Sequence, residues 1–289
     1  MIGNSFKSVL LHLRFPFSLF LLPIFLFAIA TVPMLNNAHA FWVFIILHLL
    51  VYPASNGYNS YFDKDEGSIA LLKTPPKVNY ALYVCSVCLE WLSVALSFLI
   101  SWQFAVCVLV YNSLSKAYSH PKIRLKKYPY LSFLTVFIFQ GAFIYYSVYF
   151  AVAEVNFGFT ADVFLAGIIC SCLIGASYPL TQIYQHEEDR KRGDLTLSMK
   201  LGYSGSFIFS GLLFLAGTIL MGFFCYRRLA LADFWVFLAC GSPVIGFFSA
   251  WFAKVIQDKK NANFTYMMQM TLISSSMMLI YFTWLCIWG

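Results

Sequence analysis

Charge is scarce in this chain of 289 residues. Only 11% of the residues are charged, 61% are hydrophobic, and the mean hydropathy is +0.75. A soluble domain needs far more charged surface than this, so a soluble enzyme or a solvated binding module is excluded. The sequence indicates an all-α polytopic membrane protein.

Linkers, low-complexity tracts and charged tails are absent as well. We therefore interpret residues 1–289 as one transmembrane domain. The eight cysteines do not show zinc-site spacing, and Cys85-x-x-Cys88 lies inside an apolar run, where packing is its expected role. Ala38-His39-Ala40 is an alternative signal-peptide cleavage site, but the apolar run before it is too long for an ordinary signal peptide.

Apolar runs of spanning length, roughly 17 to 25 residues, are what the chain has in abundance. They predict nine transmembrane helices, at 15–34, 40–62, 79–101, 103–119, 130–152, 162–184, 204–224, 230–253 and 265–288.

The basic residues alternate between the predicted loops. With a cytoplasmic N-terminus, every Lys and Arg except Arg227 and Arg228 falls on the cytoplasmic side. This is the distribution that the positive-inside rule describes. The net charge of +7 is thus interpreted as a topology signal, with no nucleic-acid partner expected.

Acidic residues number only twelve, and seven of them lie in segments 63–66 and 187–194. Each segment follows an apolar run on the predicted cytoplasmic side. Carboxylates at a membrane boundary are costly unless they are solvated, paired or holding a cation. Two such clusters favour a shared site for a hard metal ion such as Mg²⁺, whose natural ligand in that setting is a phosphate.

The first cluster has helical spacing. Asn56, Asn59 and Asp63 are separated as i, i+3, i+7, so they share one helix face. Asn59 and Asp63 are the predicted metal ligands, whereas Asn56 either contacts the phosphate or bonds a neighbouring helix. Asp65 and Glu66 follow as weaker candidates.

The second cluster is interpreted as an extension of the run 162–184. Gln185 and Asp189 are i, i+4, Glu188 lies beside Asp189, and Glu187 lies on a different face. The alternative is a solvated charged helix end. Arg190, which follows at once, is a candidate for phosphate binding.

Basic residues after the run 103–119 form a third group. Arg124 and Lys126 follow Tyr118-Ser119-His120-Pro121. Taken alone this is an ordinary positive-inside loop. Opposite two acidic clusters, it is placed to clamp a diphosphate, with Lys200 as a further candidate.

In this order the motifs resemble those of the UbiA superfamily of intramembrane prenyltransferases. They are Asn59-x-x-x-Asp63, Tyr118-Ser119-x-Pro121 with Arg124 and Lys126, and Glu187-x-Asp189-x-x-x-Gly193-x-x-Thr196-x-x-x-x-Leu201-Gly202. The resemblance implies helices around a central cavity open to the cytoplasmic face and to lipid, with Mg²⁺, or Mn²⁺, bound to an isoprenyl diphosphate. It also implies transfer of the prenyl group to an aromatic or lipid-like acceptor.

Asn59, Asp63 and Asp189 match the family's metal motifs, and Arg124 and Lys126 match its diphosphate loop. We predict Asp63 and Asp189 as catalytic residues that ionise the diphosphate, in a membrane protein without an obligate protein partner.

Two positions depart from the family pattern. Gly67 stands where a second Asp is usual, and Gln185 stands where the second motif usually begins with Asp. Gln185 offers a neutral oxygen, so we expect one Mg²⁺ to be held more weakly, or through Glu188 or Glu187.

Two other functions remain open. A UbiA-type terpene cyclase would ionise the same substrate without an external acceptor. A non-enzymatic transporter would carry acids at mid-membrane depth, for which Glu90 is the clear candidate.

Overall fold

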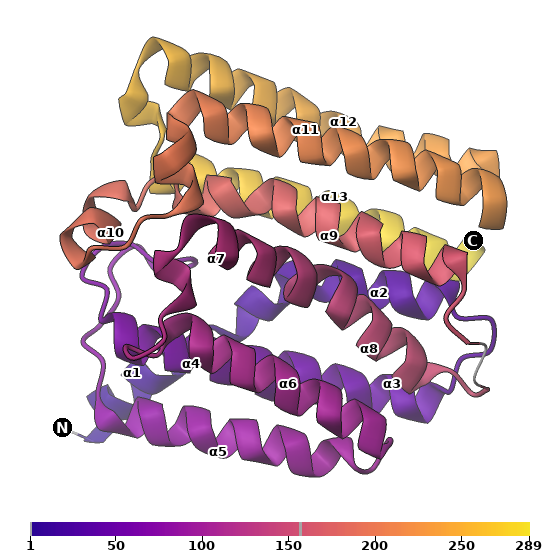
Figure 1. The fold of residues 1–289 in the computed structure, drawn as a ribbon, viewed down its shortest axis with the longest axis horizontal. Helices are drawn as coiled ribbons and strands as arrows, with labels where there is room; N and C mark the ends of the chain where they lie inside the picture. The colour runs from indigo at the N-terminus through magenta and orange to yellow at the C-terminus, as the bar shows by residue number, and fades with distance from the viewer. Residues whose placement is uncertain (1, 156–157) are drawn as a thin grey trace.

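The computed structural model describes residues 2–155 and 158–289, and these contain helices but no strands (Figure 1). The α-helices are α1 Ile2–Leu13, α2 Leu22–Thr31, α3 Asn37–Phe44, α4 Tyr52–Asp63, α5 Tyr80–Ser97, α6 Trp102–Ser119, α7 Pro129–Val136, α8 Phe143–Val152, α9 Ala161–Gln182, α10 His186–Arg192, α11 Leu197–Arg228, α12 Leu231–Gln257 and α13 Phe264–Trp288. Between them lie 3₁₀ segments η1 Phe15–Phe20, η3 Leu125–Lys127 and η5 Lys259–Asn261, and π segments η2 Ile45–Val51 and η4 Phe137–Ala142.

The long helices lie side by side between two ends of the molecule (Figure 1). One end, called here the α10 end, carries the N-terminus, α10 and the loops that follow α4, α6 and α12. The basic loops expected on one membrane face are therefore together. Arg227 and Arg228 lie at the opposite end, where both pair with Asp162.

Seven helical segments of the described chain are long and apolar enough to cross a membrane. They are Asn37–Asp63, Tyr80–Ser97, Pro129–Val152, Ala161–Gln182, Leu197–Arg228, Leu231–Gln257 and Phe264–Trp288. A bent pair, Phe6–Phe20 with Leu22–Thr31, raises the number to eight. The protein is an integral multi-pass membrane protein, but the predicted count of nine is not confirmed. Gln103, Asn112 and Lys116 lower the hydropathy of α6, which corresponds to the predicted span 103–119 and is not among the segments counted.

The first predicted span, 15–34, is not one continuous helix. α1 ends at Leu13, Arg14 takes a left-handed backbone conformation with φ 47°, and the chain bends by 40° between η1 and α2. Pro16 and Pro23 account for the break, because proline supplies no N–H for the helical hydrogen-bond ladder. The break brings Arg14 to the α10 end.

The second span contains the first acidic cluster. Its π segment η2 precedes Pro53, which interrupts the regular ladder, and the helix ends where Lys64 adopts a left-handed conformation with φ 49°. Gly57 packs closely against α5, because a Cβ at that position would lie 2.3 Å from Ser86 Oγ. This close packing helps to hold in place the helix face that bears Asn56, Asn59 and Asp63.

Aromatic packing stabilises the half of the bundle away from α10. Phe27 is fully buried, and its ring lies 5.4 Å from Tyr145, 5.5 Å from Phe224 and 4.8 Å from Phe282, between ring centroids. Burial of such rings contributes strongly to stability. The polar cavity described next lies at the other half, where helix ends converge.

Candidate active site

A cavity of about 340 Å³ collects polar side chains from α4, α6, α9 and α10 near the α10 end. We call it the polar cavity. Its polar lining includes Arg14, Asn56, Asn59, Asp63, Asp65, Tyr118, Ser119, Lys126, Gln140, Tyr178, Gln185, Asp189, Arg192 and Asp194. Segments more than a hundred residues apart thus contribute to one site.

One wall comes from α4. Asn56, Asn59 and Asp63 all line the cavity, and Asp63 is buried. The Asn59 Nδ2 donates to Ser119 Oγ at 2.8 Å, which leaves the Asn59 carbonyl oxygen available. Asn56 Nδ2 donates to the Leu13 carbonyl at 3.4 Å, so Asn56 also performs the helix-bridging role considered from the sequence.

The facing wall comes from α10. The expectation that Gln185 and Asp189 extend the preceding helix is wrong, because α9 ends at Gln182 and Gln185 is the N-cap residue of the separate α10. The acids of α10 lie in its first turn and its bases in its last turn, which suits the helix dipole of an independent helix. Gln185 and Asp189 nevertheless both line the cavity, with the Asp189 N–H donating to the Gln185 carbonyl at 2.9 Å.

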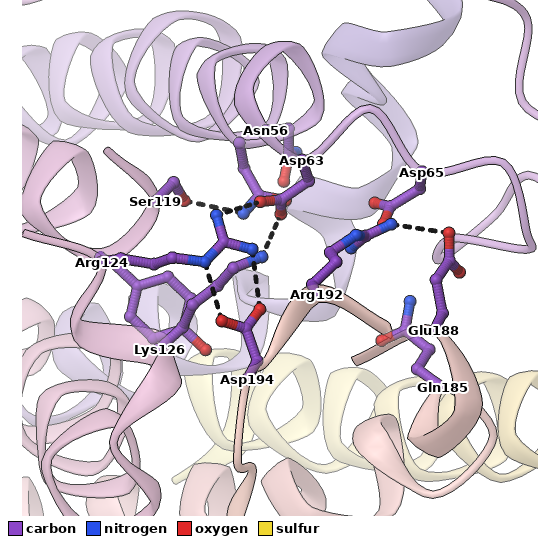
Figure 2. A network of polar contacts seen from close by, with 12 residues as sticks. Asn56, Asp63, Asp65, Ser119, Arg124, Lys126, Gln185, Glu188, Arg192 and Asp194 are labelled. Carbon is purple, nitrogen blue, oxygen red and sulfur yellow. Dashed lines mark hydrogen bonds and ion pairs between the residues drawn. The ribbon is translucent and has the colours of Figure 1, made fainter. Parts of the chain in front are cut away.

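The carboxylates and basic residues form an ion-pair network (Figure 2). Asp63 lies 2.5 Å from Lys126 Nζ and 3.5 Å from Arg124 Nη1. Arg124 also binds Asp194 through two hydrogen bonds, of 2.8 and 2.7 Å. This bidentate pair fixes the guanidinium beside Asp63.

A second part of the network joins the loop after α4 to α10. Arg192 Nη2 lies 2.5 Å from Asp65 and 2.6 Å from Glu188. Glu188 also accepts hydrogen bonds from the backbone N–H groups of Glu66 and Gly67, at 3.0 and 3.3 Å. Glycine at position 67 permits this close approach, because a Cβ there would lie 2.7 Å from Glu188 Oε2.

The oxygen ligands fit a hard cation. No ready-made group of three His, Cys, Asp or Glu side chains appears among the described residues, since the carboxylates bind Lys126, Arg124 and Arg192 instead. Asp63 Oδ1 is nevertheless buried without a hydrogen-bond partner. This carboxylate oxygen lies 3.5 Å from Arg124 Nη1, and its residue lines one cavity with Asn59 and Asp189. Such a set of oxygen donors suits Mg²⁺, which prefers oxygen ligands.

Burial shapes the protonation of the α10 carboxylate. It raises the pKa of Asp189 from 3.8 to about 7, although the positive charge of Lys126 opposes the shift. Desolvation disfavours the carboxylate, so a cation bound at this position would favour its ionised form.

The remaining predicted residues lie at different distances from the cavity. Tyr118 lines it, with its hydroxyl 2.8 Å from that of Tyr178, and Asp65 lines it beside Arg192. Glu188 contacts Arg192 but does not line the cavity. Glu66 and Glu187 are exposed and do not line it either.

Two predicted diphosphate ligands point elsewhere. Arg190 is exposed, and Lys200 is exposed with its ammonium 4.4 Å from the centre of the Tyr130 ring. Neither lines the cavity. They lie outside the cavity lining because the register of α10 puts Arg192, one turn after Glu188, on the inward face instead of Arg190, and because Lys200 lies in the first turn of α11, before the break at Gly202.

Three charged residues of the site were missed from sequence. Arg192 and Asp194 line the cavity, as does Arg14. The i, i+4 spacing of Glu188 and Arg192 was a usable signal. Asp194 pairs with Arg124, which is 70 residues away in the sequence, so no local sequence pattern predicts the contact.

Arg14 differs from the other basic residues of the site. Its guanidinium is buried, its Nε has no hydrogen-bond partner, and its Nη2 donates a long hydrogen bond, of 3.4 Å, to the Asn56 carbonyl. Within the described residues, no carboxylate forms an ion pair with it. A buried cation without an ion-pair partner carries a desolvation cost, which an anionic ligand would offset.

Glu90, the residue on which the transporter alternative depended, is not part of the cavity lining. It lies in α5 and pairs with Lys116 of α6 at 2.6 Å. An ion pair between neighbouring helices, with the Lys116 side chain partly exposed, is sufficient to account for this acid.

Several solved structures share the fold of this chain. A UbiA homolog from Archaeoglobus fulgidus bound to DMAPP and Mg²⁺ is 16% identical, with a TM-score of 0.71 over 98% of this chain and 100% of that chain. The form bound to GPP and Mg²⁺ is 18% identical, with a TM-score of 0.67 over 96% and 99%. A digeranylgeranylglyceryl phosphate synthase is 16% identical, with a TM-score of 0.64 over 98% and 99%. At such identities the similarity establishes the fold.

A search of curated protein sequences found no match. Family membership comes instead from the sequence pattern of the UbiA prenyltransferase family, which matches residues 20–288. That range includes both acidic clusters and the basic loop between them. The chain therefore belongs to the UbiA prenyltransferase family.

Proposed function

We propose that this protein transfers a prenyl group from an isoprenyl diphosphate to a hydrophobic acceptor, with Mg²⁺ as cofactor and with the α10 end facing the cytoplasm. The observation that carries the proposal is that Asp63, Asp189 and Lys126 line one cavity although they come from three separate segments. Two structural neighbours bind DMAPP or GPP together with Mg²⁺, which supports the same substrate class here.

The metal would be held by Asp63, Asp189 and Asn59, with Gln185 as a neutral oxygen ligand. When bound, Mg²⁺ neutralises the diphosphate and stabilises the charge that grows as the C–O bond breaks. Mn²⁺ prefers the same oxygen ligands and is expected to substitute.

The basic residues bind the other diphosphate oxygens. Lys126 Nζ contacts Asp63, so a small rotation of its long side chain is enough to reach a phosphate placed between Asp63 and Asp189. Arg124 is held by Asp194 and remains beside that phosphate. Arg14 approaches from the break between α1 and η1 and supplies a cation that forms no ion pair with a carboxylate of the described residues.

Ionisation breaks the bond between C1 of the prenyl group and the bridging oxygen, and pyrophosphate leaves with the electron pair. C1 then forms a bond to a nucleophilic atom of the acceptor, which releases a proton. Tyr118, Tyr178 and Phe139 line the cavity and shield the allylic cation, since aromatic faces attract positive charge.

Mass spectrometry of products tests the proposal. Purified protein in lipid nanodiscs is given DMAPP, GPP or longer isoprenyl diphosphates with Mg²⁺, with and without hydrophobic acceptors. Transfer yields a prenylated acceptor only when acceptor is present. A terpene product without acceptor indicates the cyclase alternative, and an intact diphosphate under every condition contradicts both enzymatic functions.

Metal binding is expected to depend on pH through Asp189. Because its pKa is about 7, lowering the pH from 8 to 6 protonates the carboxyl group that Mg²⁺ must find ionised. The Mg²⁺ concentration for half-saturation then rises, by about tenfold for each pH unit below 7. Mn²⁺ titration followed by electron paramagnetic resonance measures this. Asp189→Asn should remove the dependence, and an equally flat profile in the unchanged protein contradicts the assignment.

Gln185→Asp is expected to lower the Mg²⁺ concentration needed, because a carboxylate binds a hard cation more strongly than an amide oxygen. Gln185→Leu should raise it. Gln185 also donates to the Ser68 carbonyl at 3.3 Å, so thermal unfolding must be measured for both variants as a folding control. Identical Mg²⁺ titrations for the two variants and the unchanged protein would show that Gln185 is not a ligand.

A further inference from the structure

Arg192 lines the polar cavity from the last turn of α10, and two carboxylates hold it there. Its Nη2 lies 2.5 Å from Asp65 and 2.6 Å from Glu188. Both ion pairs use Nη2, so the N–H groups of Nε and Nη1 are outside these two contacts. A guanidinium that is held through one nitrogen can still donate hydrogen bonds to a ligand through the others.

The loop after α4 is tied to α10 at the two positions that depart from the expected acidic pattern. Gly67 supplies a backbone N–H to Glu188 Oε1, and Gln185 donates its side-chain amide to the Ser68 carbonyl at 3.3 Å. Neither residue adds a negative charge beside Asp65 and Glu188. Arg192 is therefore the cation that faces the remaining acids of this part of the site.

Glu188 is poorly suited to bind a metal ion. Its Oε1 already accepts N–H groups from Arg192 at 2.6 Å, Glu66 at 3.0 Å and Gly67 at 3.3 Å. These donors occupy the lone pairs of that oxygen, and their positive ends repel a cation. Asp65 pairs with the same guanidinium, and its side chain is only 8% exposed. A second divalent ion would have to displace Arg192 from both carboxylates.

The charges of the site form two groups (Figure 2). Asp63 and Lys126 belong to the group where the metal is proposed to bind, and Arg192 belongs to the other group, with Asp65 and Glu188. All of these residues except Glu188 line the same cavity. A diphosphate in the cavity can thus contact a metal through one group and a guanidinium through the other.

We propose that the Arg192 guanidinium binds the diphosphate directly and takes the place of a second divalent cation, so that the protein binds one Mg²⁺ per diphosphate. This inference rests on the proposed prenyl transfer and specifies how its diphosphate is held. A planar guanidinium donates to two phosphate oxygens at once, and Asp65 and Glu188 fix it before the substrate arrives. Its fixed charge stabilises the negative charge that grows on the leaving pyrophosphate.

Electron paramagnetic resonance counts the metal ions. The purified protein in lipid nanodiscs is titrated with Mn²⁺ in the presence of thiolo-diphosphate analogues of DMAPP, GPP and a longer isoprenyl diphosphate. We expect saturation at one Mn²⁺ per chain, with the spectrum of an isolated ion. Saturation at two Mn²⁺ per chain, with a spin-coupled spectrum, would overturn the inference and leave the proposed transfer standing. If none of the analogues binds, the proposed transfer itself fails.

Replacing Arg192 by methionine tests the contact with the diphosphate. At saturating Mn²⁺, Arg192→Met should weaken binding of the analogue by about 10- to 100-fold, measured by calorimetry. Arg190→Met is the matched control, because Arg190 is on the same helix but is exposed and does not line the cavity. It should bind the analogue as the unchanged protein does. Unchanged affinity in Arg192→Met would overturn the direct contact.

Glu188→Gln separates a direct contact from a purely structural role. The glutamine keeps the length of the side chain and an oxygen for the N–H groups of Glu66 and Gly67, but it removes a charge that neutralises Arg192. If Arg192 binds the diphosphate, affinity in this variant should be retained or increased. A loss as large as that in Arg192→Met would show that Arg192 only ties the loop to α10. The manganese count uses the unchanged protein, so it decides the inference even where thermal unfolding shows that a variant is misfolded.

Discussion

Replacing Asp63 or Asp189 by asparagine is expected to abolish prenyl transfer, with losses of about 10³-fold or more in turnover, while the fold remains intact. Asparagine keeps the shape of the side chain and removes only the charge. Both carboxylates are buried at one cavity, where a metal and its charged ligand are stabilised far more strongly than in water. The rate of pyrophosphate release measures the effect.

Asp162→Asn is the matched control. Asp162 is also ion-paired, with Arg227 at 2.7 Å, but it lies at the end of the bundle away from α10. It should retain turnover close to that of the unchanged protein. Normal turnover by either active-site variant, at a melting temperature equal to that of the control, would show that the replaced carboxylate has no role in catalysis.

Replacing Arg14 by methionine is expected to have two effects of opposite sign. Affinity for a diphosphate should fall by about 100-fold, because one charge-assisted contact in a buried site is lost. The melting temperature without ligand should rise by a few degrees. The Arg14 guanidinium is buried with its Nε unpaired, so an apolar side chain of similar length relieves a desolvation cost.

Calorimetry with a non-ionising thiolo-diphosphate and thermal unfolding in detergent measure the two effects. Arg228→Met serves as the control, because Arg228 is exposed and its ion pair with Asp162, at 3.7 Å, is weak. A lower melting temperature combined with unchanged diphosphate affinity would show that Arg14 only supports the break between α1 and η1.

The class of the protein and several residues that line the polar cavity could be predicted from the sequence because the membrane constrains both. Apolar segments must be helical to satisfy their backbone, and a chain with twelve acids leaves few candidates for a metal site. Helical spacing then placed Asn59 and Asp63 on one face, and both line the cavity with Asp189.

What the sequence could not predict depends on backbone breaks and distant contacts. The inward position of Arg14 follows from the bend at Pro16 and Pro23. From the apolar pattern alone, the segment 15–34 is predicted as one continuous span. The selection of Arg192 over Arg190 follows from the start of α10 as a separate helix.

The most direct measurement is anomalous diffraction from crystals of the protein grown with Mn²⁺ and a thiolo-diphosphate. We expect a manganese peak with carboxylate oxygens of both Asp63 and Asp189 at about 2.1–2.2 Å, and with Lys126 turned from Asp63 to a phosphate oxygen. A diphosphate bound in this cavity without manganese, or a manganese peak that neither Asp63 nor Asp189 contacts, would contradict the shared metal site.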